Sequence, residues 1–427
     1  MYIVLGIFVG LLVLMTLIVA HEFGHFLMAR RSGVTVKEFG IGFPPRIFAW
    51  LVKKDKNGKR KWEKLPKKDW GKDQNSLIFS INALPIGGFC AMDGESDDDS
   101  RKGTFGSVSY WEKTLILFGG VLMNWLVAFI ILTVLAFFGL PTLLENQFSI
   151  KSDEHIKILE SVSVVDVMEN SPAEAAGFKS GDKIIEIYPF DPSESRSSSE
   201  YYDQETGKNL WLVRSSEDVI NFNNEYANKN VYYKIEREEN DSTEQHILEA
   251  KLNNSDSDYL LGITMDYGSS TTSYTWSAPI VAAGLTVQIT GETFKGLWSL
   301  LVNLITGTAR QVSSDSSVRE EGRTQISEAS AGVSGIVGII GGYFPIIVKS
   351  GPSTVFLFMA VISISLACMN VLPIPALDGG RWLMITLARL RHKKLSKELE
   401  QKIVAKAFIF LLILMALITV LDIIRLF

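Results

Sequence analysis

The chain has 427 residues, of which 47% are hydrophobic, and its formal net charge is only −5. This length allows two or three domains, and the hydrophobic residues are gathered in blocks, which favours a membrane protein with soluble parts. The small net charge and the confined basic residues argue against a nucleic-acid partner. The two cysteines, Cys90 and Cys368, both lie outside the polar middle of the chain, so no disulfide framework is predicted there.

Four segments are long and apolar enough to cross a bilayer. They are residues 1–29, 114–140, 353–380 and 407–425. The apolar part of the third segment ends near Leu372. The first has no charge before its apolar run, is too long for the core of a signal peptide and is followed by Arg30 and Arg31. We therefore expect a polytopic α-helical membrane protein with four transmembrane helices.

Lysine and arginine residues near the helix ends predict the orientation. Segment 30–113 contains KKDKNGKRKWEKLPKKDWGK, and further basic residues follow the third span: Arg381, Arg389, Arg391, Lys393, Lys394 and Lys397. Both loops are therefore predicted to be cytoplasmic. The N-terminus, segment 141–352 and the C-terminus are predicted on the other side.

Residues 153–267 have the pattern of a folded α+β domain, with short β-type runs separated by turn residues. Its clearest feature is NSPAEAAGFKSGDKIIEI, residues 170–187. This stretch predicts a short helix after Ser171, a stop at Gly177, a tight turn at Gly181 and then a strand. Residues 189–209 are polar and rich in turn residues, and we expect them to be a loop insertion.

Residues 277–350 are harder to assign. Segment 277–308 is apolar but contains Gln288, Glu292 and Lys295, which favours an interfacial helix over a span. The polar run 312–330 is expected to be a solvated linker. The glycine-rich run 331–348 is a candidate re-entrant segment.

The motif HEFGH, residues 21–25, lies inside the first predicted span. Histidines four residues apart share one face of a helix, which is the spacing that holds a single zinc ion. Ionisable groups at membrane depth are costly unless they are paired or bind something, so ordinary packing does not account for them. Glu22 is placed to reach a water molecule instead of the metal.

A catalytic zinc needs a third protein ligand, and Asp378 in NVLPIPALDGGRW is the best candidate. It follows the cytoplasmic end of the third span, and His21 lies about nineteen residues into the first, roughly 28 Å at 1.5 Å per residue, which is a similar depth. The two motifs meet only if an odd number of membrane spans separates them. If segment 277–308 crossed the membrane as a single additional span, the ligands would lie on opposite sides. The alternative is that Asp-Gly-Gly forms an ordinary turn.

A di-iron site is excluded because the chain has only five histidines. We expect the remaining three, His155, His246 and His392, to lie on the surface.

Together, HEFGH, NVLPIPALDGG and the intervening NSPAEAAGFKSGD resemble the site-2 protease family of intramembrane zinc metalloproteases, in particular its bacterial regulator-of-sigma-E protease branch. The resemblance covers nearly the whole chain. It implies that His21, His25 and Asp378 bind Zn²⁺ and that Glu22 is the general base. It also implies a PDZ-like fold for residues 153–267, and a membrane-associated β-hairpin region on the cytoplasmic side, formed by residues 39–48 and 81–95. For the latter residues the alternative is an ordinary amphipathic loop lying on the bilayer.

Asn370, Pro373 and Pro375 match the family's pattern before Asp-Gly, which the resemblance associates with substrate binding. The prolines cannot donate backbone hydrogen bonds and should interrupt the third span. For Asn370 the alternative is an interhelical hydrogen bond. Asn124, in GGVLMNW, is interpreted as a packing residue between helices, since Val121 stands where the family often has proline.

The resemblance implies cleavage of single-pass transmembrane proteins within the lipid bilayer of the bacterial inner (plasma) membrane. Examples would be anti-sigma factors or signal-peptide remnants, acted on first by an upstream site-1 protease. The active site would face the cytoplasm, and the PDZ-like domain would be extracytoplasmic, where it either gates or recruits substrates. The alternatives are a non-catalytic PDZ-bearing membrane adaptor, against which the intact motifs argue, and a zinc transporter, which would need ionisable groups in several spans.

Overall fold

The computed structural model describes most of the chain, namely residues 2–54, 60–70, 76–94, 96–144, 146–157, 162–192, 211–213, 216–239, 242–254, 257, 259–265, 271–311, 315–331, 335 and 337–426. Contacts divide the chain into two units. The first consists of Met1–Leu135 and Pro279–Phe427, and the second of Ala136–Ala278. Each is described by itself.

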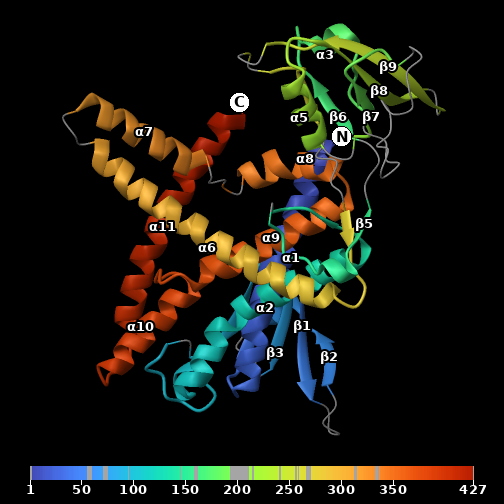
Figure 1. The fold of residues 1–427 in the computed structure, drawn as a ribbon. Helices are drawn as coiled ribbons and strands as arrows, with labels where there is room; N and C mark the ends of the chain where they lie inside the picture. The colour runs from blue at the N-terminus through green and yellow to red at the C-terminus, as the bar shows by residue number, and fades with distance from the viewer. Residues whose placement is uncertain are drawn as a thin grey trace. The chain divides into compact units, whose positions relative to one another are not determined.

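Within the part of the chain that the structure describes, three helices are long and apolar enough to cross a membrane: α1 (Tyr2–Arg31), α2 (Tyr110–Phe138) and α9 (Pro352–Val371). They overlap three of the four predicted spans (Figure 1). The fourth predicted span lies within α11 (Lys397–Leu426), and its crossing of the membrane stays a prediction.

The third predicted span, 353–380, is not one helix. Helix α9 ends at Val371, and a new helix, α10 (Asp378–Leu390), begins after six intervening residues. The reason is the pair Pro373 and Pro375, which lack the N–H groups that would continue the helix. As a result, Asp378 stands at the first position of α10 and not at the end of a span.

Helices α1 and α2 contact each other through glycine. A Cβ atom built on Gly24 would lie 2.1 Å from the carbonyl oxygen of Gly119, and one built on Gly119 would lie 2.7 Å from that of Gly24. Only glycine permits such an approach, which brings the two backbones together at the level of HEFGH.

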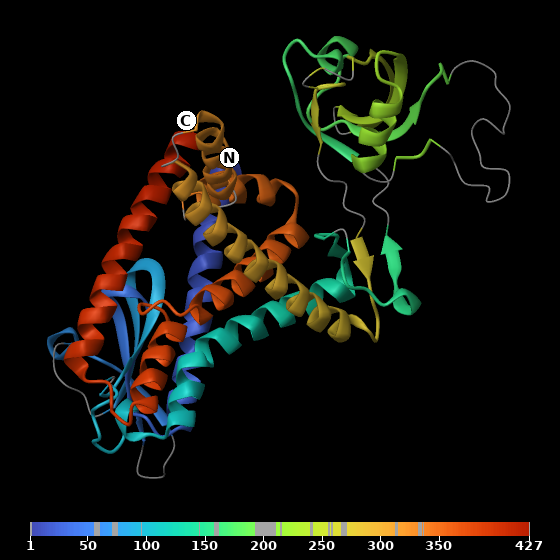
Figure 2. The ribbon, with the colours of Figure 1, turned by 60° about the vertical axis from the view of Figure 1, so that its left-hand side comes forward.

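The predicted hairpin region is a sheet in the order β2-β1-β3, made of β1 (Val36–Lys54), β2 (Arg60–Lys64) and β3 (Leu77–Met92). Phe39 of β1 pairs with both Phe79 and Cys90 of β3. The part of β1 around Phe39 therefore lies between two parts of β3, a first leg that contains Phe79 and a second leg formed by residues 88–92. The sheet lies beside α1 (Figure 2), where Gly88 of the second β3 leg approaches Val19. No other strand among the described residues pairs with the outer edge of that leg.

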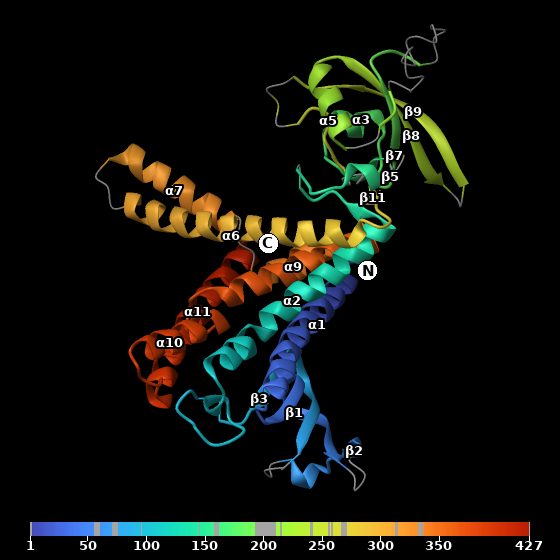
Figure 3. The same cartoon turned by 60° about the horizontal axis from the view of Figure 1, so that its bottom comes forward.

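The prediction of a linker at 312–330 is wrong, because residues Ser316–Ala331 form helix α7. This helix runs beside α6 (Ala278–Gln311), as Figure 3 shows, and Arg310 pairs with Glu321 at 3.2 Å. Gly322 lies close to the carbonyl oxygen of Gly307. The sequence of α7 is polar and has no apolar face, so its pattern did not predict a helix. Contacts with the neighbouring helix α6 stabilise it.

The candidate re-entrant run contains a π-helical turn, η4 (Gly338–Tyr343), which continues into α8 (Phe344–Lys349). Both elements contact α1. In α8, Pro345 lies against Gly6 and the fully buried Phe344 against Gly10. Its depth in the membrane, and the interfacial position of α6, stay predictions.

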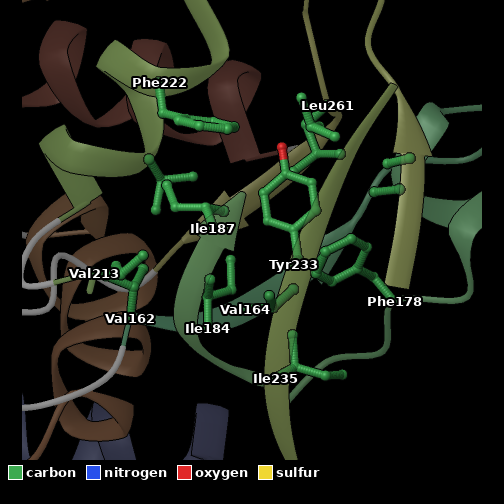
Figure 4. Close-up of a cluster of buried hydrophobic side chains, with 14 of the residues drawn as sticks. Val162, Val164, Phe178, Ile184, Ile187, Val213, Phe222, Tyr233, Ile235 and Leu261 are labelled. Atoms are coloured by element: carbon green, nitrogen blue, oxygen red, sulfur yellow. The ribbon is translucent and has the colours of Figure 1, made fainter. Parts of the chain in front are cut away.

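The second unit contains a five-stranded antiparallel sheet in the order β10-β6-β7-β8-β9. Its strands are β6 (Val162–Val167), β7 (Lys183–Tyr188), β8 (Asn230–Glu239), β9 (Ser242–Lys251) and β10 (Ile263–Met265). Among the described residues of this unit, helices α3 (Pro172–Ala176) and α5 (Ser216–Glu225) accompany the sheet. Figure 4 shows the core, in which Tyr233 and Phe178 meet edge to face.

The helix, stop and strand predicted for residues 170–187 are all present. Ser171 caps α3 by accepting a hydrogen bond from the Glu174 amide, and Gly177 ends it with a positive φ of 86°. The predicted loop insertion at 189–209 lies mostly outside the described residues. Of the three other histidines, His155 and His392 are exposed as expected, and His246 is half-buried.

A small sheet in the order β4-β11-β5 also belongs to the second unit, formed by β4 (Leu140–Pro141), β5 (His155–Lys157) and β11 (Thr271–Ser273). Beside it, the buried carboxylate of Asp153 accepts hydrogen bonds from the amide and hydroxyl groups of both Thr275 and Ser277. Burial works to raise the pKa of Asp153, but these hydrogen bonds outweigh it and hold the pKa below its usual range.

Candidate zinc site

Helix α1 carries both histidines of HEFGH on one face. Their Nε2 atoms are 3.1 Å apart, and each residue is only 8% exposed. The helix is continuous from Tyr2 to Arg31, so the four-residue spacing acts as the sequence analysis expected.

Asp378 completes the cluster from the start of α10. Its Oδ2 atom is 3.1 Å from His21 Nε2 and 3.4 Å from His25 Nε2. The two following glycines make this possible, because a Cβ on Gly379 or Gly380 would lie 2.0 Å from a carbonyl oxygen of the preceding segment. The Asp-Gly-Gly sequence is therefore a helix start held tightly against residues 371–375, where the positive helix end favours a carboxylate.

The geometry of these three residues fits zinc. A tetrahedral ion with ligands at 2.0–2.1 Å separates those ligands by about 3.3 Å, close to the 3.1, 3.1 and 3.4 Å seen here. His25 Nδ1 lies 2.7 Å from the carbonyl oxygen of Ile116. A proton donated there leaves His25 Nε2 free as a ligand.

Glu22 is half-buried and lies outside the ligand cluster. It lines a cavity of about 290 Å³ together with His21, His25 and Asp378, and its carboxylate accepts a hydrogen bond from the backbone of Cys90 in β3. Glu22 therefore faces the same space as the three ligands and is held by the edge strand.

The structure places the other predicted site residues differently. Asn370 lines the same cavity, and its Nδ2 atom donates to the carbonyl oxygen of Leu366 within α9, so this hydrogen bond is not interhelical. Pro375 lines an adjoining cavity of about 640 Å³, which also borders Asp378. Pro373 is exposed.

Sequence reasoning missed two contacts from α2. A Cβ on Gly120 would lie 2.6 Å from the Nε2 atoms of both His21 and His25. One turn later, Asn124 has its Nδ2 atom 3.4 Å from His21 Nδ1. The only signals were the small residues and the lone amide in GGVLMNW, and neither shows which neighbour it meets.

Comparison with known proteins identifies the family of the chain. The sequence model described as Peptidase family M50 matches residues 9–58 and 61–415. The chain belongs to peptidase family M50. Zinc is the metal of this family, so the M50 chain is a zinc metalloprotease, and a protease is favoured over a non-catalytic adaptor.

Relatives of this M50 peptidase align over nearly their whole length. A protein of Clostridium perfringens is 25% identical over 421 residues, which cover 97% of each chain. One from Fusobacterium nucleatum is 26% identical over 422 residues, 98% of each, and one from Staphylococcus aureus is 25% identical over 496 residues, 96% of each. All three carry the name "Putative zinc metalloprotease".

Proposed function

We propose that this M50 peptidase hydrolyses peptide bonds in the transmembrane segments of single-pass membrane proteins, in regulated intramembrane proteolysis. The observation that carries the proposal is the position of the cluster. The ligand atoms of His21, His25 and Asp378 lie within 4.8 Å of one another, on helices that include one long and apolar enough to cross a membrane. Ionisable groups at membrane depth are costly unless they are paired or bind something, so their presence there indicates a functional site.

When bound, zinc would lower the pKa of a water molecule to about 7 and polarise the peptide carbonyl. Glu22, which lines the cavity without belonging to the ligand set, would accept the proton of the attacking water and return it to the leaving amine. The hydrogen bond from the backbone of Cys90 would keep the Glu22 carboxylate turned towards this space.

A transmembrane helix hides its carbonyl groups in i to i−4 hydrogen bonds, so the substrate must be locally extended before cleavage. The position of the second leg of β3, residues 88–92, supports a role for this leg in holding the substrate extended. Its inner side pairs with β1, and Cys90 on this leg contacts Glu22. We propose that the substrate adds to the outer edge as a further strand and that Asn370, on the cavity wall, engages its backbone.

We further propose that the protein lies in the inner membrane of a bacterium, with four spans, the zinc site towards the cytoplasm and the PDZ-like residues 153–267 outside. The basic segments next to the first and third spans support this orientation. In that position residues 153–267 would admit a substrate only after an upstream site-1 protease has trimmed its external part. Anti-sigma factors and signal-peptide remnants are the substrates that the family resemblance favours.

The proposal is tested with the purified full-length protein and a reconstituted single-pass substrate. We expect cleavage inside the substrate's span, loss of cleavage on chelation of zinc, and recovery when zinc is returned. A non-catalytic adaptor would bind the same substrate and leave it uncut at every zinc concentration.

A further inference from the structure

Asn124 contacts His21 of the zinc site, and the proposed function gives this side chain no role. It is fully buried (0% exposed) in α2, on the same face as Gly120, which lies against both histidines. Ile116, whose carbonyl oxygen contacts His25, lies one further turn away on that face. This face of α2 therefore runs alongside both predicted histidine ligands.

In the side-chain amide of Asn124, the nitrogen has a polar contact and the oxygen has none among the described residues. Nδ2 lies 3.4 Å from Nδ1 of His21, whereas Oδ1 is buried and has no hydrogen-bond partner among the described residues. A buried amide oxygen without a partner is unfavourable. The oxygen and nitrogen of an asparagine amide differ little in shape, so their placement is decided by the hydrogen bonds they make.

Turning the amide by half a rotation gives the buried oxygen a hydrogen-bond partner. The Nε2 atom of His21 faces His25 and Asp378, so a His21 that binds metal through Nε2 carries its proton on Nδ1. That N–H needs an acceptor, and the turned Oδ1 of Asn124 would lie at the position of the 3.4 Å contact. His25 already has the equivalent arrangement, in which Nδ1 faces a carbonyl oxygen of α2.

The main chain of Asn124 is fixed independently. Its carbonyl oxygen accepts a hydrogen bond of 2.8 Å from Ser363 of α9, and Ser363 is also fully buried. Packing between helices thus involves the backbone of Asn124, while the side chain faces His21.

We propose that Asn124 is a positioning residue that orients His21 by accepting a hydrogen bond from Nδ1, so that Nε2 is presented to zinc. This inference rests on the proposed zinc site. Partners of this kind, behind a metal-binding histidine, raise metal affinity, and their loss costs about 10- to 100-fold.

The test measures the zinc affinity of the full-length protein in detergent by competition with a chelator. Asn124→Leu removes the acceptor while keeping a side chain branched at Cγ, and we expect zinc to bind about 10- to 100-fold more weakly. Asn124→Asp keeps an oxygen in place and should bind zinc far more tightly than Asn124→Leu. If Asn124→Leu does not fold, the smaller Asn124→Val makes the same comparison.

Ser363→Ala is the matched control, because it removes a buried hydrogen bond to the same residue but leaves the acceptor of His21 intact. We expect unchanged zinc affinity for this variant. Equal zinc affinity in wild type and Asn124→Leu, or equal losses in Asn124→Leu and Ser363→Ala, would overturn the inference. Tight zinc binding by Asp378→Ala would instead contradict the zinc site itself, and the inference with it.

Discussion

Gly120 lies against both imidazoles of the zinc site, and its lack of a side chain is what lets α2 pass there. The Cβ of Gly120→Ala would lie 2.6 Å from the Nε2 atoms of His21 and His25, so the imidazoles or the helix must shift. We expect zinc affinity to fall by at least about tenfold, measured by chelator competition.

Gly296→Ala provides the control for this substitution. Gly296 is also helical, in α6, but a Cβ there would meet nothing within 4 Å. It should leave zinc affinity unchanged and raise the stability of the helix by up to about 1 kcal/mol. Wild-type zinc affinity in Gly120→Ala would show that α2 does not constrain the ligands.

At the scale of residues, much of the candidate site can be predicted from spacing. His21 and His25 are one turn apart on any helix, and the depth argument brings Asp378 towards them. Asn124 and Gly120 could not be assigned, because their contacts depend on how α1 and α2 are rotated about their axes. Gly24 and Gly119 fix that rotation through backbone contact, which no periodicity reveals.

At the scale of elements, the position of the segment just before α6 is held by the carboxylate of Asp153. Hydrogen bonds from Thr275 and Ser277 lower the pKa of Asp153 in the folded state, so its charged form stabilises the fold. That stabilisation is complete above the unfolded pKa, about 3.9, and is lost as the pH falls through the lower folded pKa.

Thermal unfolding of the wild type and of Asp153→Asn between pH 7 and pH 2 tests this. The wild type should unfold at a higher temperature than the variant by a constant amount above about pH 5. The gap should narrow below about pH 4. A gap that stays constant down to pH 2 would mean that the charge of Asp153 does not contribute.

The elements also show where sequence patterns stop being informative. Proline predicted the end of α9 because a missing N–H acts locally. The two-legged path of β1 and β3 was not predictable, since their pairing is interrupted by register shifts that depend on the partner strand. Helix α7 was missed because its stability comes from α6 and not from an apolar face of its own.

For the whole molecule, the orientation in the membrane follows only from the distribution of basic residues. Lys61 and Glu238 have exposed side chains in segments predicted on opposite sides. In a background without Cys90 and Cys368, an impermeant thiol reagent applied to intact cells should modify Glu238→Cys, and should modify Lys61→Cys only after lysis. The reverse pattern would invert the topology.

The gate hypothesis predicts the result of removing the five-stranded sheet of the second unit. Deletion of residues 162–265 with a short flexible linker keeps Asp153 and its partners. We expect the variant to cut full-length substrate that the wild type leaves intact. If it binds zinc and cuts trimmed substrate but still spares full-length substrate, the domain is not a gate, and weaker cutting of trimmed substrate would indicate recruitment.

The central claim is that a zinc site made by His21, His25 and Asp378, with Glu22 as its base, cuts a membrane span. The most direct test is mass spectrometry of the products from a reconstituted single-pass substrate, comparing wild type with Glu22→Gln at equal zinc occupancy. We expect the wild type to cut within the span, and Glu22→Gln to retain zinc but to be at least about 100-fold slower. Cleavage by Glu22→Gln at a rate near that of wild type, or wild-type cleavage only outside the span, would contradict it.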